Sequence, residues 1–136
     1  MTAPSLRMVV GFDGSEGSQK ALLWAAEEAR LRGAKVDVVR AWSPGEFGSD
    51  EEFAHIVDKK LEEDVHSLLG SDPGFEFKLV VQRGRPATVL MDLAKEAQIL
   101  VVGSRGHGGF AGLLLGSVSQ QVTTHASAPV VVVVKN

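Results

Sequence analysis

The sequence predicts an α/β fold over residues 1–136: a single, doubly wound, five-stranded parallel sheet with helices on both faces. Three observations lead to this prediction. The chain has 136 residues, the length of one domain. Short apolar segments alternate with segments whose apolar residues recur at helical spacing, an order typical of β–α–β units. Two of the short segments, 99–102 and 130–134, are apolar throughout, as strands buried on both faces are.

The expected elements follow one another along the whole chain. We expect strands over residues 8–12, 36–42, 75–81, 99–102 and 130–134. We expect helices over residues 15–33, 49–68, 86–97 and 116–125. Ser15 is suited to cap the first helix and Gly33 to end it. Pro86 suits the first turn of the third helix.

Composition excludes several classes of protein. The chain has no cysteine, which excludes disulfide scaffolds, thiolate metal sites and thiol catalysis. Its formal net charge is −3, so a large basic field for nucleic acid is not expected. Residues 1–7 contain no apolar secretion segment, and no apolar run approaches the ~20 residues that span a membrane. We therefore expect a cytoplasmic protein that binds neither nucleic acid nor membrane.

A glycine-rich stretch, Gly103 to Gly112, follows the fourth strand. Glycines let the backbone approach a ligand closely, and their N–H groups can form a nest for an anion. Ser117 stands where the next helix begins, and helix N-termini favour phosphate. These features favour phosphate binding over a flexible surface loop. A Walker A loop is excluded because the stretch has no lysine, and the Gly-x-Gly-x-x-Ala match at 106–111 lacks the context of a dinucleotide fingerprint.

A longer pattern fits better. Gly103-x-x-Gly106, nine residues and then Gly116-Ser117 resembles the nucleotide-binding motif of the universal stress protein family, in its ATP-binding branch. The resemblance extends over nearly the whole chain. It includes the segments 9–15, 84–87, 101–109, 114–119 and 128–133. One departure is Gln98, where the family often has an aspartate before the fourth strand.

The resemblance implies a Rossmann-like fold of the adenine nucleotide alpha hydrolase type, with ATP in the crevice between the first and fourth strands. It implies that Asp13 contacts the ribose and helps to hold Mg²⁺, and that the backbone of Ala41 reads adenine. The alternative to this ligand role is that Asp13 only forms the turn after the first strand. The other nucleotide contacts that it implies are Gly11, Gly103, Gly106, Gly116, Ser117, Val118 and, more weakly, Ser119. Arg105 and His107 are the nearby cations for the phosphates. AMP, ADP or a cyclic nucleotide is as compatible with these residues as ATP.

No set of residues predicts catalysis. Asp13 is the only carboxylate near the loop, and no Ser-His-Asp set stands out. The resemblance implies a nucleotide-dependent stress-response regulator that acts on a protein partner. The alternatives are an interaction module without nucleotide, a slow ATP hydrolase and a flavin or dinucleotide enzyme. A phospho-acceptor receiver is disfavoured because Gln82, not aspartate, ends the third strand.

The last strand also predicts assembly. An apolar strand at a sheet edge needs protection, and pairing with the same strand of a second chain supplies it. A homodimer is also what the family resemblance implies. The alternative is a central strand in a monomer. The interface residues would be Val130, Val131, Val132, Val133 and Val134.

Overall fold

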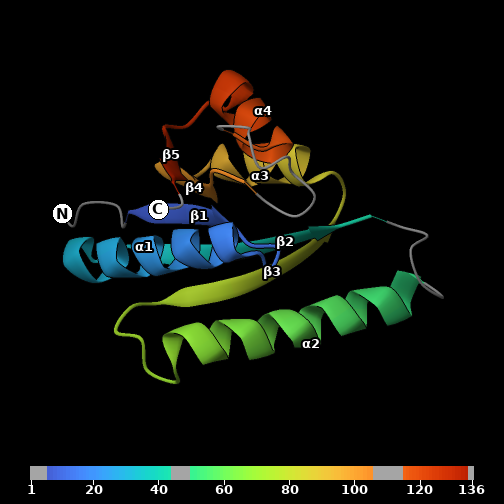
Figure 1. Ribbon diagram of the computed structural model, residues 1–136. Helices are drawn as coiled ribbons and strands as arrows, with labels where there is room; N and C mark the ends of the chain where they lie inside the picture. Colours follow the sequence, from blue (N-terminus) through green and yellow to red (C-terminus); the bar gives the residue numbers. More distant parts are fainter. Residues whose placement is uncertain (1–5, 44–49, 106–114, 135–136) are drawn as a thin grey trace.

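Strands and helices alternate throughout the described part of the chain (Figure 1). The computed structural model describes residues 6–43, 50–105 and 115–134. Its strands are β1 (Arg7–Gly11), β2 (Lys35–Trp42), β3 (Phe77–Arg83), β4 (Ile99–Gly103) and β5 (Val130–Val133). Its helices are α1 (Glu16–Arg32), α2 (Asp50–Leu69), α3 (Pro86–Ala94) and α4 (Ser117–His125).

The five strands form one parallel sheet in the order β3-β2-β1-β4-β5. The chain moves outward from β1 to β3, then returns and places β4 on the other side of β1. The strand order therefore reverses between β1 and β4. In sheets of this kind ligands bind outside the carboxyl ends of the strands at that reversal. The predicted doubly wound fold is confirmed.

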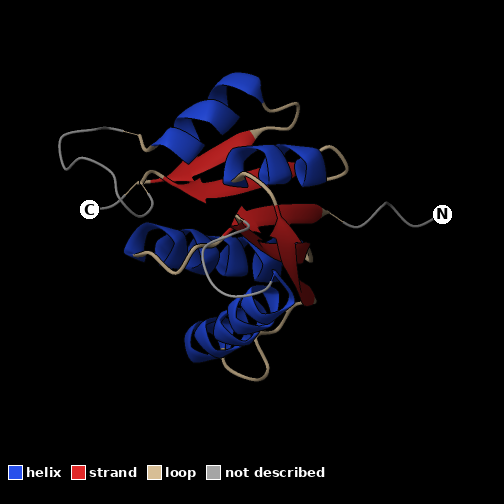
Figure 2. Ribbon diagram, turned by 90° about the vertical axis from the view of Figure 1, so that its right-hand side faces the viewer, coloured by secondary structure: helices blue, strands red, loops and turns tan. Residues whose placement is uncertain are grey.

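Helices cover both faces of the sheet, with α1 and α2 on one face and α3 and α4 on the other (Figures 1 and 2). Alternate residues of each strand point to opposite faces. Met8 and Val10 of β1 thus lie in the core under α1 and α2, whereas Val9 packs with Leu90 of α3 and Val122 of α4. Each face of the sheet has its own apolar core.

The local signals for helix ends are confirmed where the structure describes them. The Ser15 hydroxyl accepts a hydrogen bond from the Ser18 N–H, 3.3 Å away, at the start of α1. Gly33 ends α1 in the left-handed conformation, at φ 66°. Pro86 occupies the first turn of α3. The predicted start of the second helix at Ser49 lies outside the described residues.

Several predicted boundaries are wrong by a few residues. β3 begins at Phe77 rather than at Phe75, because its pairing with β2 starts where Phe77 faces Val36. Phe75 instead packs under the Arg30 guanidinium, with 5.6 Å between the centre of its ring and the Cζ atom of Arg30. α3 ends at Ala94 rather than at residue 97, and β5 ends one residue before Val134.

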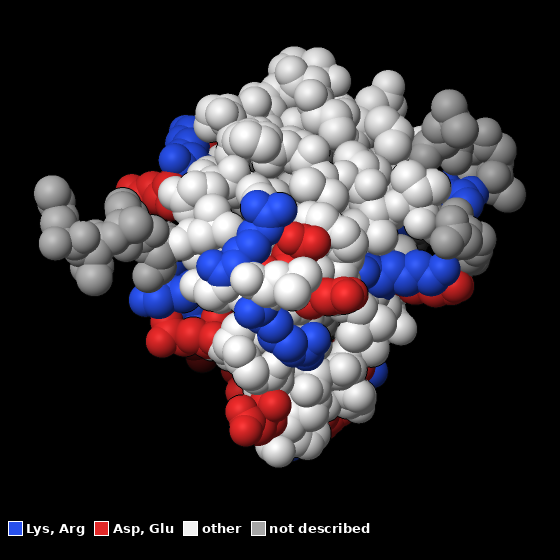
Figure 3. All heavy atoms as spheres, turned by 90° about the vertical axis from the view of Figure 1, so that its left-hand side faces the viewer, with Lys and Arg blue, Asp and Glu red and all other residues white. Residues whose placement is uncertain are grey.

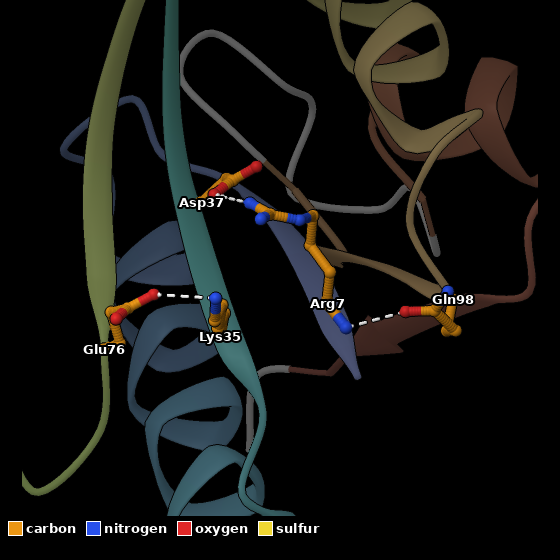
Figure 4. A network of polar contacts seen from close by, with 5 residues as sticks. All are labelled: Arg7, Lys35, Asp37, Glu76 and Gln98. Carbon is orange, nitrogen blue, oxygen red and sulfur yellow. Dashed lines mark hydrogen bonds and ion pairs between the residues drawn. The ribbon is translucent and has the colours of Figure 1, made fainter. Parts of the chain in front are cut away.

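A network of charged residues lies at the amino ends of the strands, opposite the reversal point (Figure 4). Arg7 donates to the Asp37 carboxylate over 2.8 Å, and Lys35 lies 3.2 Å from Glu76. The side-chain oxygen of Gln98 accepts a hydrogen bond from the Arg7 backbone N–H over 2.6 Å. Figure 3 shows positive and negative side chains interspersed on this face. The described residues of this face therefore present a mixed charge.

Candidate functional site

The candidate site lies where the carboxyl ends of β1 and β4 meet the N-termini of α1 and α4. These strands are neighbours in the sheet, with Val10 of β1 facing Val101 of β4. Two helix N-termini directed to one place make its surroundings electropositive. This is the position that the sequence predicts for the ligand.

The loop between β1 and α1 is held by hydrogen bonds within itself. The Asp13 carboxylate accepts from the Ser15 N–H over 2.9 Å, and the Asp13 N–H donates to the Ser18 hydroxyl over 3.3 Å. The turn-forming role of Asp13 is thereby confirmed. Its contact with a ribose or a metal ion stays a prediction.

Two glycines bring α1 against the end of β4. A side chain on Gly103 would point toward α1, and its Cβ would lie 2.6 Å from the carbonyl carbon and oxygen of Gly17. A Cβ on Gly17 would in turn overlap the Arg105 carbonyl. The first turn of α1 therefore packs directly on the backbone that leaves β4. Sequence reasoning missed Gly17, although a glycine two residues after a helix cap is a signal of close packing.

The chain that leaves β4 and the chain that enters α4 are joined at their base. The buried Ser104 carbonyl accepts hydrogen bonds from the Gly116 N–H and from the Ser119 hydroxyl, the latter over 2.8 Å. Ser119 is 2% exposed. Its hydroxyl thus closes the base of the loop, a role that the sequence did not predict. A nucleotide contact by Ser119 stays a prediction.

The N-terminus of α4 lacks a capping side chain. Gly116 occupies the cap position, where it offers no side-chain oxygen. Within the described residues, the N–H groups of Ser117 and Val118 have no hydrogen-bond acceptor. Ser117 is exposed, whereas the Val118 side chain packs against the core under α3. The helix therefore presents free N–H groups beside the reversal point, which is how proteins bind phosphate.

The backbone of Ala41 faces the same crevice. In a parallel strand the N–H and C=O of alternate residues point to the same neighbour. Val39 accepts from Phe12 on the β1 side, and Trp42 accepts from Gly84 on the β3 side. The polar groups of Ala41 therefore point to the β1 side, beyond the end of β1. No backbone hydrogen bond to them is found within the described chain.

Gly11 is explained by packing rather than by a ligand. A Cβ at this position would point to the other face of the sheet, 2.8 Å from Cδ1 of Leu90. A glycine here thus lets Leu90 of α3 pack close to β1. A nucleotide contact through the Gly11 backbone stays a prediction.

Some predicted residues cannot be placed in the site. Gly106 and His107 lie outside the described residues. Arg105 follows β4, and its carbonyl faces Gly17. Within the described chain, no three of the His, Asp and Glu residues are grouped as a protein-only metal site would require. A metal at Asp13 would therefore be held largely by the ligand's phosphates and by water, as Mg²⁺ often is.

A separate cavity of about 460 Å³ lies beside the site, under α2. Its walls come from the β1–α1 loop, β2 and α2. They are Phe12, Asp13, Gly14, Gln19, Arg40, Phe53, Ile56, Val57, Lys60, Leu61 and Asp64. Lys60 and Asp64 form an ion pair of 2.9 Å, and this hydrogen bond raises the pKa of Lys60 above its usual value. Apart from Asp13, sequence reasoning assigned no function to these residues.

β5 lies at an edge of the sheet rather than at its centre. All four of its valines are partly buried, because helices cover both faces while none of the described strands pairs with its outer edge. Val134 follows the strand and is 65% exposed. Pairing with a second chain stays a prediction.

Comparison with known proteins identifies the family. The sequence profile of the universal stress protein family matches residues 5–134. A universal stress protein of Mycobacterium tuberculosis strain H37Rv is 39% identical over 140 residues, which cover 95% of this chain and 44% of the relative. One from Mycolicibacterium smegmatis is 37% identical, covering 94% of this chain and 45% of the relative. The chain thus spans less than half the length of these relatives.

Solved structures agree. A universal stress protein in complex with cAMP has a TM-score of 0.70 and 28% identity, covering 96% of this chain and 98% of that chain. One from Archaeoglobus fulgidus in complex with dAMP has a TM-score of 0.71 and 29% identity, covering 93% and 96%. No helix in the described chain is long and apolar enough to cross a membrane. By sequence and by fold, this chain belongs to the universal stress protein family.

Proposed function

We propose that this chain binds an adenine nucleotide between β1 and β4 and acts as a nucleotide-dependent regulator. The observation that carries the proposal is the uncapped N-terminus of α4 at the point where the strand order reverses. A helix start without a capping side chain leaves N–H groups that a ligand or water can satisfy. Two universal stress proteins of solved structure, 28% and 29% identical to this chain, are in complex with cAMP and dAMP. This supports an adenine nucleotide as the ligand.

The phosphates would lie at α4. The N–H groups of Ser117 and Val118 supply donors, and the exposed Ser117 hydroxyl supplies another. Because Ser104 joins both ends of the loop, the helix start is held in place before any ligand binds. A preformed set of donors favours an anion without a further cost of ordering.

The adenine would lie at the end of β1, against Ala41. The backbone of Ala41 offers a donor and an acceptor side by side on the edge that β1 leaves open. The N1 and amino group of adenine offer an acceptor and a donor side by side. A flat base in this position extends the sheet in place of the next residue of β1. The contact needs no particular side chain, so a small alanine serves.

The ribose and the metal ion would lie between these two ends, near Asp13. The Asp13 carboxylate accepts from the Ser15 N–H, and a carboxylate can accept from several partners at once. It could accept a ribose hydroxyl or coordinate Mg²⁺ that also binds the phosphates. We propose ATP with Mg²⁺ as the first ligand to test, and AMP, ADP and cyclic AMP as its competitors.

We propose a binding role rather than an enzymatic one. Phosphoryl transfer to water needs a residue that orients the water and a cation that stabilises the transition state. Asp13 is the candidate carboxylate at the site, and its hydrogen bond from the Ser15 N–H already holds it in a turn. A cytoplasmic regulator whose ligand alters a partner contact, or a dimer through β5, fits this site. At most we expect slow hydrolysis of ATP.

Thermal shift measurements test the proposal. Metal-stripped protein is heated with ATP, AMP, cyclic AMP, NAD and FMN, each with and without Mg²⁺. A ligand at ~100 times its Kd adds ~2.7 kcal/mol to the free energy of unfolding, which is roughly 10 °C in Tm for a chain of this length. Adenine nucleotides should produce this shift and FMN should not. No shift with any nucleotide, in folded protein free of retained ligand, would favour the interaction module.

Variants connect the shift to the site. Asp13→Asn keeps an oxygen that can accept from Ser15 but removes the charge, so the fold should survive while the shift from Mg²⁺-ATP decreases. Asp58→Asn is the matched control, because Asp58 is an exposed carboxylate of α2 that does not line the cavity. Light scattering tests the dimer separately, and a mass near that of one chain at micromolar concentration would refute it.

A further inference from the structure

The cavity under α2 is distinct from the crevice between β1 and β4. Its walls include the side chain of Arg40, which lies on the α2 face of β2, but not Ala41, Ser104 or any residue of α4. Within the described chain, the two places share the loop at Asp13 and Gly14. A volume of about 460 Å³ lies within the usual range of pockets for small molecules.

Most of the cavity wall is apolar. Phe12, Phe53, Val57 and Leu61 are less than one tenth exposed, and the ring of Phe53 packs on Trp42 at 5.5 Å. Ile56 is 58% exposed at the rim. A large apolar side chain exposed beside a cavity lined with buried aromatic and aliphatic groups favours a ligand with an apolar part.

Arg40 supplies the polar recognition. Its side chain is half-buried on β2, between residues whose side chains form the core. Within the described chain it makes no hydrogen bond or ion pair. Partly buried arginines are usually paired, because removing the guanidinium from water without a partner is unfavourable. Among the described residues, the five N–H donors of Arg40 therefore lack the oxygen partner that a carboxylate, phosphate or sulfonate would supply.

The other charges of the cavity limit the charge of its ligand. Lys60 is paired with Asp64, and one Asp13 oxygen accepts from Ser15. With Arg40, the four groups carry two positive and two negative charges, so the lining is neutral. One negative charge on the ligand would pair with Arg40, whereas several would be repelled by the two carboxylates. This excludes a polyphosphate from the cavity.

We propose that the cavity under α2 binds a monoanionic amphipathic molecule, with its acid group on Arg40 and its apolar part against Phe12, Phe53 and Leu61. This site is separate from the nucleotide site proposed above and does not depend on it.

Octanoate and octanol serve as a matched pair of probes, because they share a chain and differ in charge. Binding is measured by calorimetry, with Trp42 fluorescence as a second readout of the Phe53 wall. Arg40→Gln should weaken octanoate about tenfold to a hundredfold, as expected for a lost charge-assisted bond, and change octanol less than twofold. Ile56→Asp at the exposed rim should weaken both probes. Lys59→Gln, on an exposed part of α2 outside the cavity, should change neither.

The outcomes separate this proposal from the nucleotide proposal. One octanoate should still bind per chain when the protein is saturated with AMP, and it should also bind if no nucleotide binds at all. The proposal is overturned if octanoate does not bind the unaltered protein or binds Arg40→Gln equally well. Complete displacement of octanoate by AMP would also overturn it, because the cavity would then be part of the nucleotide site.

Discussion

Replacing Gly103 by alanine should separate α1 from β4. The new Cβ would lie 2.6 Å from the carbonyl carbon and oxygen of Gly17. Both atoms belong to the backbone of a helix, so no side-chain rotation can relieve the overlap. The first turn of α1 must move, and the Ser15 cap and the Asp13 turn move with it.

The size of the effect follows from a comparison with Gly11. At Gly11 the Cβ would meet Cδ1 of Leu90 at 2.8 Å, and that methyl group can rotate away. Overpacking a core costs about 1–3 kcal/mol, while replacing glycine by alanine in a strand returns about 0.5–1 kcal/mol. We expect Gly103→Ala to lose about 2 kcal/mol of unfolding free energy, near the top of this difference, because its new Cβ meets backbone atoms. Gly11→Ala should lose about 1 kcal/mol or less.

Urea denaturation followed by tryptophan fluorescence measures both variants, since Trp24 and Trp42 both pack against apolar cores. The more destabilised variant should also lose roughly 10 °C in Tm. Gly103→Ala should in addition weaken nucleotide binding, because it displaces the loop that carries Asp13. If Gly103→Ala is as stable as the unaltered protein, or more stable than Gly11→Ala, the close contact of α1 with β4 is refuted.

Three further substitutions test the contacts around this point. Ser15→Ala removes the cap of α1 and should cost about 1 kcal/mol in urea denaturation, whereas a change below 0.3 kcal/mol would show that the cap is not formed. Ser119→Ala leaves the Ser104 carbonyl with one donor fewer. It should lower the free energy of unfolding by about 1 kcal/mol and Tm by a few degrees, while nucleotide-induced shifts are retained. Loss of those shifts with unchanged Tm would instead make Ser119 a ligand contact. Asp37→Asn weakens the ion pair with Arg7, whose side chain is one third exposed. It should lower the free energy of unfolding by roughly 1 kcal/mol at low salt and by less at 1 M salt. A loss that does not depend on salt would contradict an electrostatic cause.

Local signals predicted the fold well. Ser15 and Gly33 delimit α1 because a cap depends on residues only a few positions away. The start of β3 was missed because it depends on which residue of β2 it faces, and pairing across a sheet is not local. Phe75 alternates correctly for a strand, yet it packs on Arg30 of another element instead.

The candidate site was predictable only where it needs an unusual residue. The glycine-rich pattern drew attention to Gly103 and Gly116. In the structure a side chain on Gly103 would overlap α1, and Gly116 occupies the cap position of α4 without a capping side chain. Gly17 escaped notice because the backbone that it approaches lies almost ninety residues further along the chain. Arg40 escaped notice as well, because its sequence position does not show that its side chain lines a cavity with residues of α2.

Ala41 shows why resemblance and geometry are both needed at such a site. Its side chain lies in the core under α3, so composition and hydropathy describe it as a packing residue only. The groups that would read a base are its N–H and C=O, which every residue but proline has. Their availability depends on where β1 stops, and β1 stops because Asp13 and Ser15 turn the chain into α1. Recognition of a base by these backbone groups therefore depends on the register between β1 and β2. Substitution of Ala41 by a larger apolar residue should disturb the core under α3 before it disturbs the base contact.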